Sequence, residues 1–158
     1  MSFGKELAGL FRRDLTRLSQ EIRAFPDDLT LWRVAPGVTN CAGNLVLHLE
    51  GNLREYFGRQ LAGVPYQRDR SREFSASGVP QGELAARVEA LLQTVPGWIE
   101  SLPEGKWDAP YPEQVLDGIR STRQFAISLH GHFNWHLGQI DYLRRVLTGA
   151  GALKLAGL

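Results

Sequence analysis

Apolar residues recur at intervals of three and four along four segments of this chain, and such a period predicts amphipathic helices. The first segment runs from about Phe3 to Phe25 and ends before Pro26, because proline lacks an amide hydrogen and disfavours helix in the residue before it. No segment shows the sustained alternation of a strand, so the sequence predicts an all-α protein. The apolar positions of the first segment share one helical face: Phe3, Leu7, Leu10, Phe11, Leu15, Leu18 and Ile22.

Two helices are predicted in the middle of the chain. Thr39 or Asn40 can cap the first of them, which should run to about Leu61 before a glycine stop. A third helix should start near Gln81. Pro96 falls inside this third helix and should kink or shorten it, because its ring removes one backbone hydrogen bond.

The last helix can be capped by Ser121 or Thr122 and should continue to about Thr148. Two connections, residues 66–80 and 103–119, are long and show no sustained period. The first of them is polar and charged, and loops of this length are often functional. Four amphipathic helices with two long connections predict a four-helix bundle with long crossover connections.

The composition limits the classes of function. At 158 residues the chain has the length of one domain, taken as residues 1–158. A net charge of +1, with acidic and basic residues interspersed, gives no reason to expect a nucleic-acid partner. Cys41 is the only cysteine, which excludes an intramolecular disulfide and zinc sites built on cysteine pairs. No signal peptide and no run of about 20 apolar residues is present, so we expect a soluble, cytoplasmic protein that does not contact a membrane.

The strongest functional signal is the pair His132 and His136 in the last helix. An α-helix turns about 100° per residue, so the two imidazoles lie about 40° apart and roughly 6 Å along the axis. An unpaired buried polar group costs about 1–3 kcal/mol, so two imidazoles in a core need partners, and one shared metal ion would satisfy both. The pair shares a face with apolar residues that should point to the core: Phe125, Leu129, Ile140, Leu143 and Leu147.

Hydrogen-bonded core histidines without a metal explain this pair equally well. His130 lies about 160° around the helix from His132, so it is a poor candidate for a third ligand. In metalloprotease helices a glutamate follows the first histidine, but Phe133 stands in that position here, and no zincin-type chemistry follows. Gln139 lies near the face of the histidine pair and can contact the metal ligands.

His48 is the remaining candidate for a third ligand. In the predicted second helix it shares a face with Asn44, Asn52 and Glu55, whereas the neighbouring leucines point elsewhere. Two interpretations remain open on this spacing. His48 can be a solvent-exposed residue of a polar face, or that face can line a polar cleft opposite the last helix.

Two sequence segments resemble one known family. The residues TNCAGNLVLHLEGNLR from position 39 and HFNWHLGQIDYLR from position 132 are similar to the DinB/YfiT-like superfamily. Its members carry one histidine on the second helix and an HxxxH followed by Gly-Gln-Ile on the last. The resemblance spans most of the chain in helix order and implies a four-helix bundle, often dimeric. It also implies a Zn²⁺ or Ni²⁺ site formed by His48, His132 and His136.

The resemblance further implies a class of reaction. Three imidazoles leave a tetrahedral ion one open position, as catalytic sites do. Members of this superfamily include S-transferases and isomerases that use bacillithiol, mycothiol or glutathione. We therefore expect a metal-dependent transferase of the thiol S-transferase kind, or a hydrolase, acting on a small molecule and forming a homodimer. The alternative is a non-catalytic bundle that is stabilised by its metal or serves dimerisation.

Few other residues suggest a role, and no catalytic residue is assigned. Asn52 and Glu55 share the face of His48 and can orient a ligand or accept a proton. Arg59 lies further along and can pair with an anionic group. For all three, a solvated surface position is the favoured interpretation, because polar helix faces are usually exposed.

Arg68, Arg70 and Arg72 form a basic cluster in the first long connection, where a carboxylate-bearing thiol can dock, although charged loops are common. Cys41 lies about two turns from His48 in the projection, so we expect a small packing residue. The four tryptophans, including Trp135, are expected to be packing residues as well.

Overall fold

The computed structural model describes residues 2–115, 118 and 120–154, and all regular secondary structure in these residues is helical. The prediction of an all-α protein is therefore confirmed. Apart from helices, the described part of the chain contains two isolated β-bridges, one of which joins Pro110 to Ser121. None of the described helices combines the length and the apolar character needed to cross a membrane.

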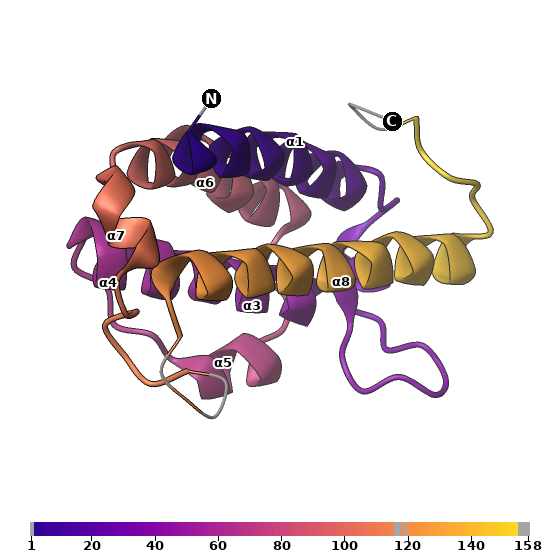
Figure 1. Cartoon of the computed structure of the whole chain (residues 1–158). Coiled ribbons are helices and arrows are strands. Elements are labelled where there is room, and N and C mark those ends of the chain that lie inside the picture. The colour runs from indigo at the N-terminus through magenta and orange to yellow at the C-terminus, as the bar shows by residue number, and fades with distance from the viewer. Residues whose placement is uncertain (1, 116–117, 119, 155–158) are drawn as a thin grey trace.

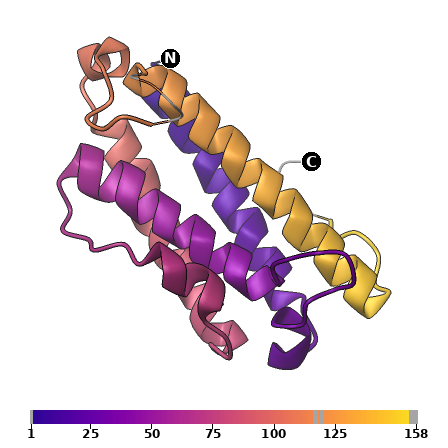
Figure 2. The same cartoon turned by 90° about the horizontal axis from the view of Figure 1, so that it is seen from below.

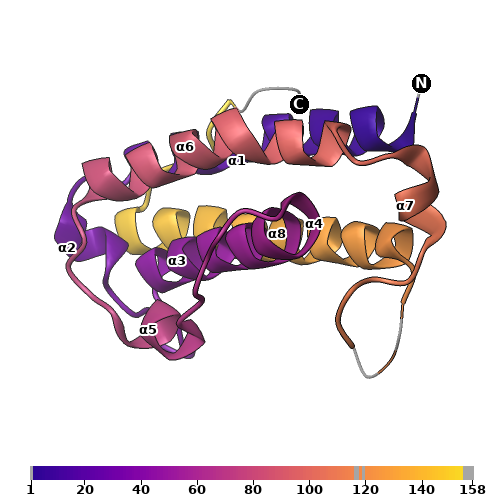
Figure 3. The same cartoon turned by 90° about the vertical axis from the view of Figure 1, so that its left-hand side faces the viewer.

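Four long helices lie in two layers. Helix α1 (Phe3–Arg23) packs along α6 (Gln81–Glu100) in one layer, and α3 (Ala42–Leu53) packs against α8 (Thr122–Thr148) in the other, as Figures 1 and 3 show. The remaining helical segments are short. α2 (Asp28–Leu31) and α7 (Glu104–Asp108) stand in connections between the two layers. The π-helix η1 (Arg54–Arg59) and α4 (Gln60–Ala62) continue α3, and α5 (Arg70–Ser75) packs against α3.

The cap of α3 differs from the prediction. Cys41 is the N-cap residue, rather than Thr39 or Asn40, and its Sγ accepts a hydrogen bond from the amide of Asn44 at 3.5 Å. The thiol also donates to Asn44 Oδ1, with 2.9 Å between the two atoms. Burial raises the pKa of the Cys41 thiol, so the residue is a neutral cap and not a reactive group. Cysteine ranks low as a capping residue, which explains why the polar neighbours were favoured.

The second predicted helix is divided in the structure. It covers nearly the expected span, from α3 through η1 to α4, and ends before Gly63, whose φ of 69° lies in the left-handed region. The π-helical segment η1 adds residues to each turn and changes which side chains share a face beyond Leu53. The helical projection of the sequence could not include this change of register.

Proline does not shorten α6. The helix continues through Pro96, which is buried, and ends at Glu100, close to the expected end of the apolar pattern. The long connection that follows is irregular as predicted from Pro110 onward, after the short helix α7. Residues 116, 117 and 119 of that connection lie outside the described part of the chain.

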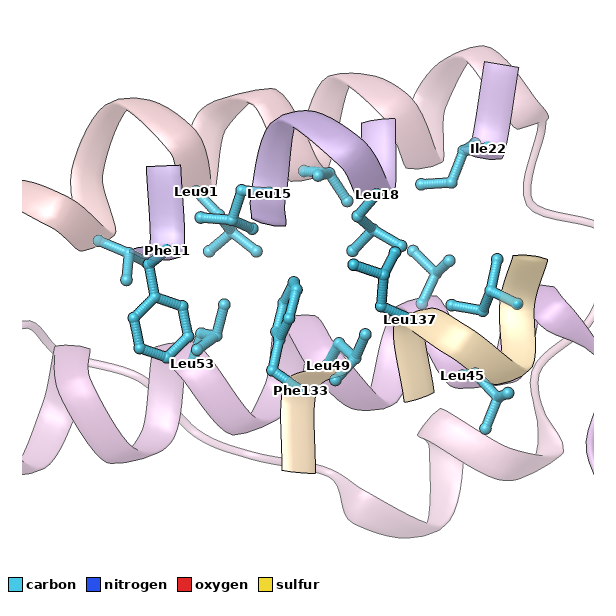
Figure 4. Packing of buried hydrophobic residues seen from close by; sticks show 14 of the residues in the cluster. Phe11, Leu15, Leu18, Ile22, Leu45, Leu49, Leu53, Leu91, Phe133 and Leu137 are labelled. Carbon is cyan, nitrogen blue, oxygen red and sulfur yellow. The ribbon is translucent and has the colours of Figure 1, made fainter. Parts of the chain in front are cut away.

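The core lies between the two layers, and Figure 4 shows its centre. The side chains from α8 that enter it include Phe133 and Leu137, which are 1% and 6% exposed. His132 and His136, which were expected on the core-facing stripe, instead lie beside it and are partly exposed. The other labelled residues come from α1, α3 and α6: Phe11, Leu15, Leu18, Ile22, Leu45, Leu49, Leu53 and Leu91.

Three of the four tryptophans pack as expected. Trp107 is fully buried, and Trp32 and Trp98 pack against the core from its edge. Trp135 contradicts the prediction, because 70% of its surface is exposed on α8. Most of this large apolar side chain therefore lies outside the packing of the described residues.

Candidate metal centre

Three histidines from two helices converge on one point. His48 of α3 and His132 and His136 of α8 each offer one ring nitrogen, and these nitrogens all lie within 4.8 Å of one another. The Nε2 atoms of His48 and His132 are 3.0 Å apart. A tetrahedral zinc ion with bonds of 2.0–2.1 Å requires its nitrogens to be about 3.3 Å apart. The three rings therefore need only small side-chain movements to share one ion.

The three rings differ in burial. His48 is 6% exposed and lies at the bottom of the group, so the interpretation as a solvent-exposed residue is wrong. His132 and His136 lie nearer the surface and are partly exposed. The polar face of α3 is thus turned toward α8, and it forms the floor of a cleft and not a solvated surface.

The orientation of His48 is set by a buried carboxylate. Its Nδ1 lies 2.9 Å from Oε2 of Glu73, which is 6% exposed. Arg68 donates two hydrogen bonds to the same carboxylate, at 2.7 Å and 2.9 Å. Burial alone would raise the pKa of Glu73, but the hydrogen bonds from Arg68 and His48 outweigh it and lower that pKa. An ionised Glu73 only accepts, so Nδ1 of His48 carries the hydrogen and Nε2 keeps its lone pair toward the other histidines.

A second acceptor orients His136 in the same way. Its Nδ1 lies 2.7 Å from Oε1 of Gln139, one helical turn further along α8. The amide oxygen accepts the Nδ1 hydrogen, which leaves the lone pair of Nε2 available to a ligand. Two of the three rings are therefore held in the tautomer that a metal site requires.

The surroundings of His132 and His136 also favour the neutral form of these two rings near physiological pH. Burial, followed by the charges of His136 and His48 nearby, lowers the pKa of His132 to about 4. Burial likewise lowers the pKa of His136, although its bond to Gln139 opposes the shift. Neutral imidazole is the form that coordinates a cation, so the environment favours binding over protonation.

Helix α5 brings Glu73 to the site, within a connection that was expected to be a loop. Asp69 caps this short helix, and the side-chain amide of Asn44 donates to the carbonyl oxygens of Glu73 and Ala76 at 3.1 Å and 2.9 Å. Gly51 of α3 leaves the space that the carboxylate occupies, because a Cβ there would lie 2.0 Å from Glu73 Oε1. The close approach of α5 to α3 thus depends on one glycine.

Replacing Gly51 by alanine is expected to displace the Glu73 carboxylate and to weaken metal binding about 10- to 100-fold, the usual effect of losing a partner of a ligand histidine. Titration of metal-free protein with Zn²⁺ in a calorimeter measures the change. Gly9→Ala is the matched control, since a Cβ at Gly9 has nothing within 4 Å. An unchanged affinity in Gly51→Ala would show that Glu73 does not orient His48.

The other residues of the His48 face are buried, which corrects their expected surface position. Asn52 is 4% exposed, and its side-chain nitrogen lies 3.1 Å from Nε2 of His48. Glu55 is 7% exposed, but its hydrogen bonds go to Arg59 and Gln60. The structure therefore places Asn52 in contact with the histidine group, whereas Glu55 is bound within its own helix.

Two cavities flank the histidines. One, of about 240 Å³, is lined by His48 and His132 together with Tyr56, Arg68 and Arg70, among others. The second, of about 530 Å³, adjoins His136 and Gln139 on the opposite side and is mainly apolar, with walls from the 35–40 connection and from the last turns of α8. A molecule in either cavity would contact at least one of the three rings.

The basic cluster of the first long connection is divided between different surroundings. Arg68 is bound to Glu73, and Arg72 lines a separate cavity. The guanidinium of Arg70 lies over the ring of Phe74, with 5.3 Å between them, and borders the cavity of His48 and His132. Of the three, Arg70 is thus the best placed to meet an anionic group there.

His130 lies outside the histidine group, as expected. Its Nε2 is 2.9 Å from Oδ2 of Asp14, a fully buried residue of α1. Hydrogen bonds from His130, Arg13 and Asn134 hold the pKa of that carboxyl far below its usual range, although burial opposes the shift. This second polar cluster joins α8 to α1 and has a structural role.

Sequence reasoning missed Glu73, and it gave Arg68 a docking role and not its contact with Glu73, because no helical projection connects a residue of a long connection with a helix face. Gly51 was the one available signal. A glycine inside a helix, one turn from a candidate ligand, indicates the close approach of another segment.

No family model matches this chain, and no curated protein matches it in a sequence search. The distances, burial and hydrogen bonds of the three histidines are what indicate a metal centre.

Proposed function

We propose that His48, His132 and His136 bind one divalent cation, Zn²⁺ or Ni²⁺, and that the chain is a metal-dependent enzyme that acts on a small molecule. The observation that carries this proposal is the convergence of three ring nitrogens within 4.8 Å. In His48 and His136 the other ring nitrogen donates a hydrogen bond, to Glu73 and to Gln139 respectively. Bonds of about 2 Å to one ion are compatible with these separations.

The proposal includes the fold family. We assign the chain to the DinB/YfiT-like superfamily, as a four-helix bundle with long crossover connections. Its support is the motif HxxxH-Leu-Gly-Gln-Ile on the last long helix and a single histidine on the second. The pairing of α1 with α6 and of α3 with α8 is compatible with such a crossover order.

The chemistry follows from the ligand set and the cavities. A divalent cation held by three imidazoles lowers the pKa of a water molecule or thiol beside it, and so supplies a nucleophile at neutral pH. Asn52 is positioned to hold a polar group next to His48, and Arg70 a carboxylate in the same cavity. The apolar cavity beside His136 accepts a hydrophobic body. These surroundings favour an amphipathic, anionic small molecule, and among reactions a thiol S-transferase over a hydrolase.

A metal that only stabilises the bundle is the second candidate. The positions of the ligands on two different helices favour it, because an ion bound by α3 and α8 would join the two helices of one layer. A structural site normally has four protein ligands, however, and the group found in the described residues has three. The open position favours the enzyme.

Metal content tests the site. Protein purified without an affinity tag should contain about one equivalent of zinc or nickel by mass spectrometry, and His136→Ala should contain almost none. His130→Ala is the matched control, because it removes a histidine of the same helix that lies outside the group and should retain the metal. Equal metal contents in all three proteins, or none in the wild type, would refute the site.

The reaction class requires a separate experiment. In a thermal shift panel of glutathione, mycothiol and bacillithiol, at least one thiol should raise the melting temperature of the metal-loaded wild type. None of the three should raise the melting temperature of His136→Ala. If no thiol stabilises the loaded protein, the transferase assignment is wrong while the metal site stands.

A further inference from the structure

The larger of the two cavities beside the histidines, of about 530 Å³, lies between α8 and the connection from α2 to α3. This connection, residues 32–41, loops out beside the last turns of α8, as Figures 1 and 2 show. Tyr142, Leu143 and Val146 of α8 and Leu45 of α3 supply most of the remaining wall. Sites for small molecules usually have volumes of about 300–1,000 Å³, so this cavity has the size of a ligand site.

Hydrogen bonds hold the loop that forms one wall. At its centre is a proline–glycine turn, closed by a hydrogen bond from the amide of Val38 to the carbonyl oxygen of Ala35 at 3.3 Å. Gly37 has a φ of 79°, the left-handed value that a type II turn requires of its third residue. The guanidinium of Arg33 donates to the carbonyl oxygen of Leu147 at 2.8 Å and ties the loop to the end of α8. The cavity is therefore formed before any ligand binds, as ligand sites usually are.

The lining of this cavity carries no charged side chain. Among the described residues that form it, none is a lysine, arginine, aspartate or glutamate. Arg145 lies over the ring of Tyr142, with 4.9 Å between them, but it is paired with Asp141 and does not line the cavity. The cavity on the other side of the histidine group, by contrast, contains Arg68 and Arg70. Because an unpaired ion is costly to place in apolar surroundings, the larger cavity favours a neutral ligand.

Two side-chain amides at the cavity have hydrogen bonds left to donate. Oε1 of Gln139 accepts from His136, but neither hydrogen of its Nε2 has an acceptor in the part of the chain that the structure describes. Asn40 is partly buried, and its side chain has no hydrogen-bond partner within the described ranges. A carbonyl or similar oxygen of a ligand would give these amides the acceptor that they lack.

We propose that this cavity binds a neutral, mainly apolar small molecule and holds its hydrogen-bond acceptor with the amides of Asn40 and Gln139. The apolar body of the ligand lies between the loop and the last turns of α8. There it covers the side chains of Val38 and Val146, which are exposed large apolar groups in the lining. His136 belongs to the same lining, so the bound molecule lies beside one of the three rings.

The assignment of this ligand as a substrate rests on the proposed function, whereas its binding does not. The two cavities have no lining residue in common and lie on opposite sides of the three rings. An anionic thiol fits the cavity that contains Arg70, and the neutral molecule beside His136 is then the second substrate. On that basis the transferase has one polar, anionic substrate and one apolar, uncharged substrate.

Titration of metal-free protein with prodan tests the cavity, because this neutral naphthalene ketone emits at shorter wavelength in apolar surroundings. We expect one site per chain with a dissociation constant of about 100 µM or lower. Val38→Trp fills the cavity from the loop and should raise this constant roughly tenfold or more. Val34→Trp is the matched control and should leave it unchanged, since Val34 is an exposed valine of the same connection that does not line the cavity.

The hydrogen bond has its own test. Asn40→Leu keeps the size of the side chain but removes the amide, so it should weaken the binding of prodan about three- to tenfold. The same variant should bind dimethylaminonaphthalene, which lacks the ketone, as the wild type does. Zinc binding should be normal in all three variants, so a failure of the metal site and a failure of the cavity are separate results.

Three results would each overturn the proposal. They are the absence of saturable prodan binding to the wild type, an unchanged affinity in Val38→Trp, and an equal change of affinity for both dyes in Asn40→Leu. The first would show that the cavity takes no neutral apolar ligand, the second that the dye binds elsewhere, and the third that Asn40 holds no acceptor. None of the three would contradict the metal site, because the protein is titrated without metal.

Discussion

Zinc at about a thousand times its dissociation constant is expected to raise the free energy of unfolding by about 4 kcal/mol. The reason is that His48 on α3 and the two histidines on α8 meet only in the folded chain, so an ion held by all three binds the folded state far better than the unfolded one. Urea denaturation of the chelator-treated protein with and without zinc measures the difference at constant temperature.

His132→Ala is the informative variant for this linkage. The residue is partly exposed, so its truncation should change the metal-free stability little while removing most of the stabilisation by zinc. His130→Ala should keep the full effect of zinc despite losing its bond to Asp14. Stabilisation that persists in His132→Ala would place the ion outside the histidine group.

Replacing Arg144 by leucine is expected to lower the free energy of unfolding by about 3–5 kcal/mol. Arg144 is 1% exposed, and its Nε donates to Oε2 of the fully buried Glu21 at 2.6 Å, which joins α8 to α1. Burial raises the pKa of Glu21 against the effect of this bond, so the carboxylate depends on its cation. The substitution would leave a buried charge without its partner, and denaturation by urea measures the cost.

Two comparisons separate this effect from a general loss of packing. In the double variant Glu21→Leu/Arg144→Leu most of the stability should return, because no unpaired charge remains. Arg12→Leu removes the exposed pair with Glu100 between α1 and α6 and should change the stability little. If Arg144→Leu and Arg12→Leu cost the same, the buried pair has no special role.

The helices and the histidine pair could be predicted because both depend on local spacing. The three- and four-residue period identified all four long helices, and the cap of α8 is Ser121, one of the two candidates. The separation of His132 and His136 is fixed by the helix itself, so their proximity needed no tertiary information. Their position beside the core was not predicted, because the buried face of α8 extends from the expected stripe to Phe133 and Leu137 and leaves the two histidines at its edge.

The rest of the site depends on contacts between distant segments. Whether His48 faced solvent or a cleft could not be decided from α3 alone, because the answer depends on the position of α8. The Glu73 carboxylate comes from a short helix inside a polar connection, and only the space left at Gly51 allows it to reach His48. Trp135 was expected to be a packing residue because tryptophan is highly buried on average, yet 70% of its surface is exposed in this chain.

Anomalous diffraction at the zinc absorption edge, from crystals of untagged protein grown with zinc, tests the central claim most directly. The account predicts a single strong peak about 2.0–2.1 Å from one ring nitrogen each of His48, His132 and His136. No peak at this position, or a peak bound by other residues while the three rings stay together, would contradict it.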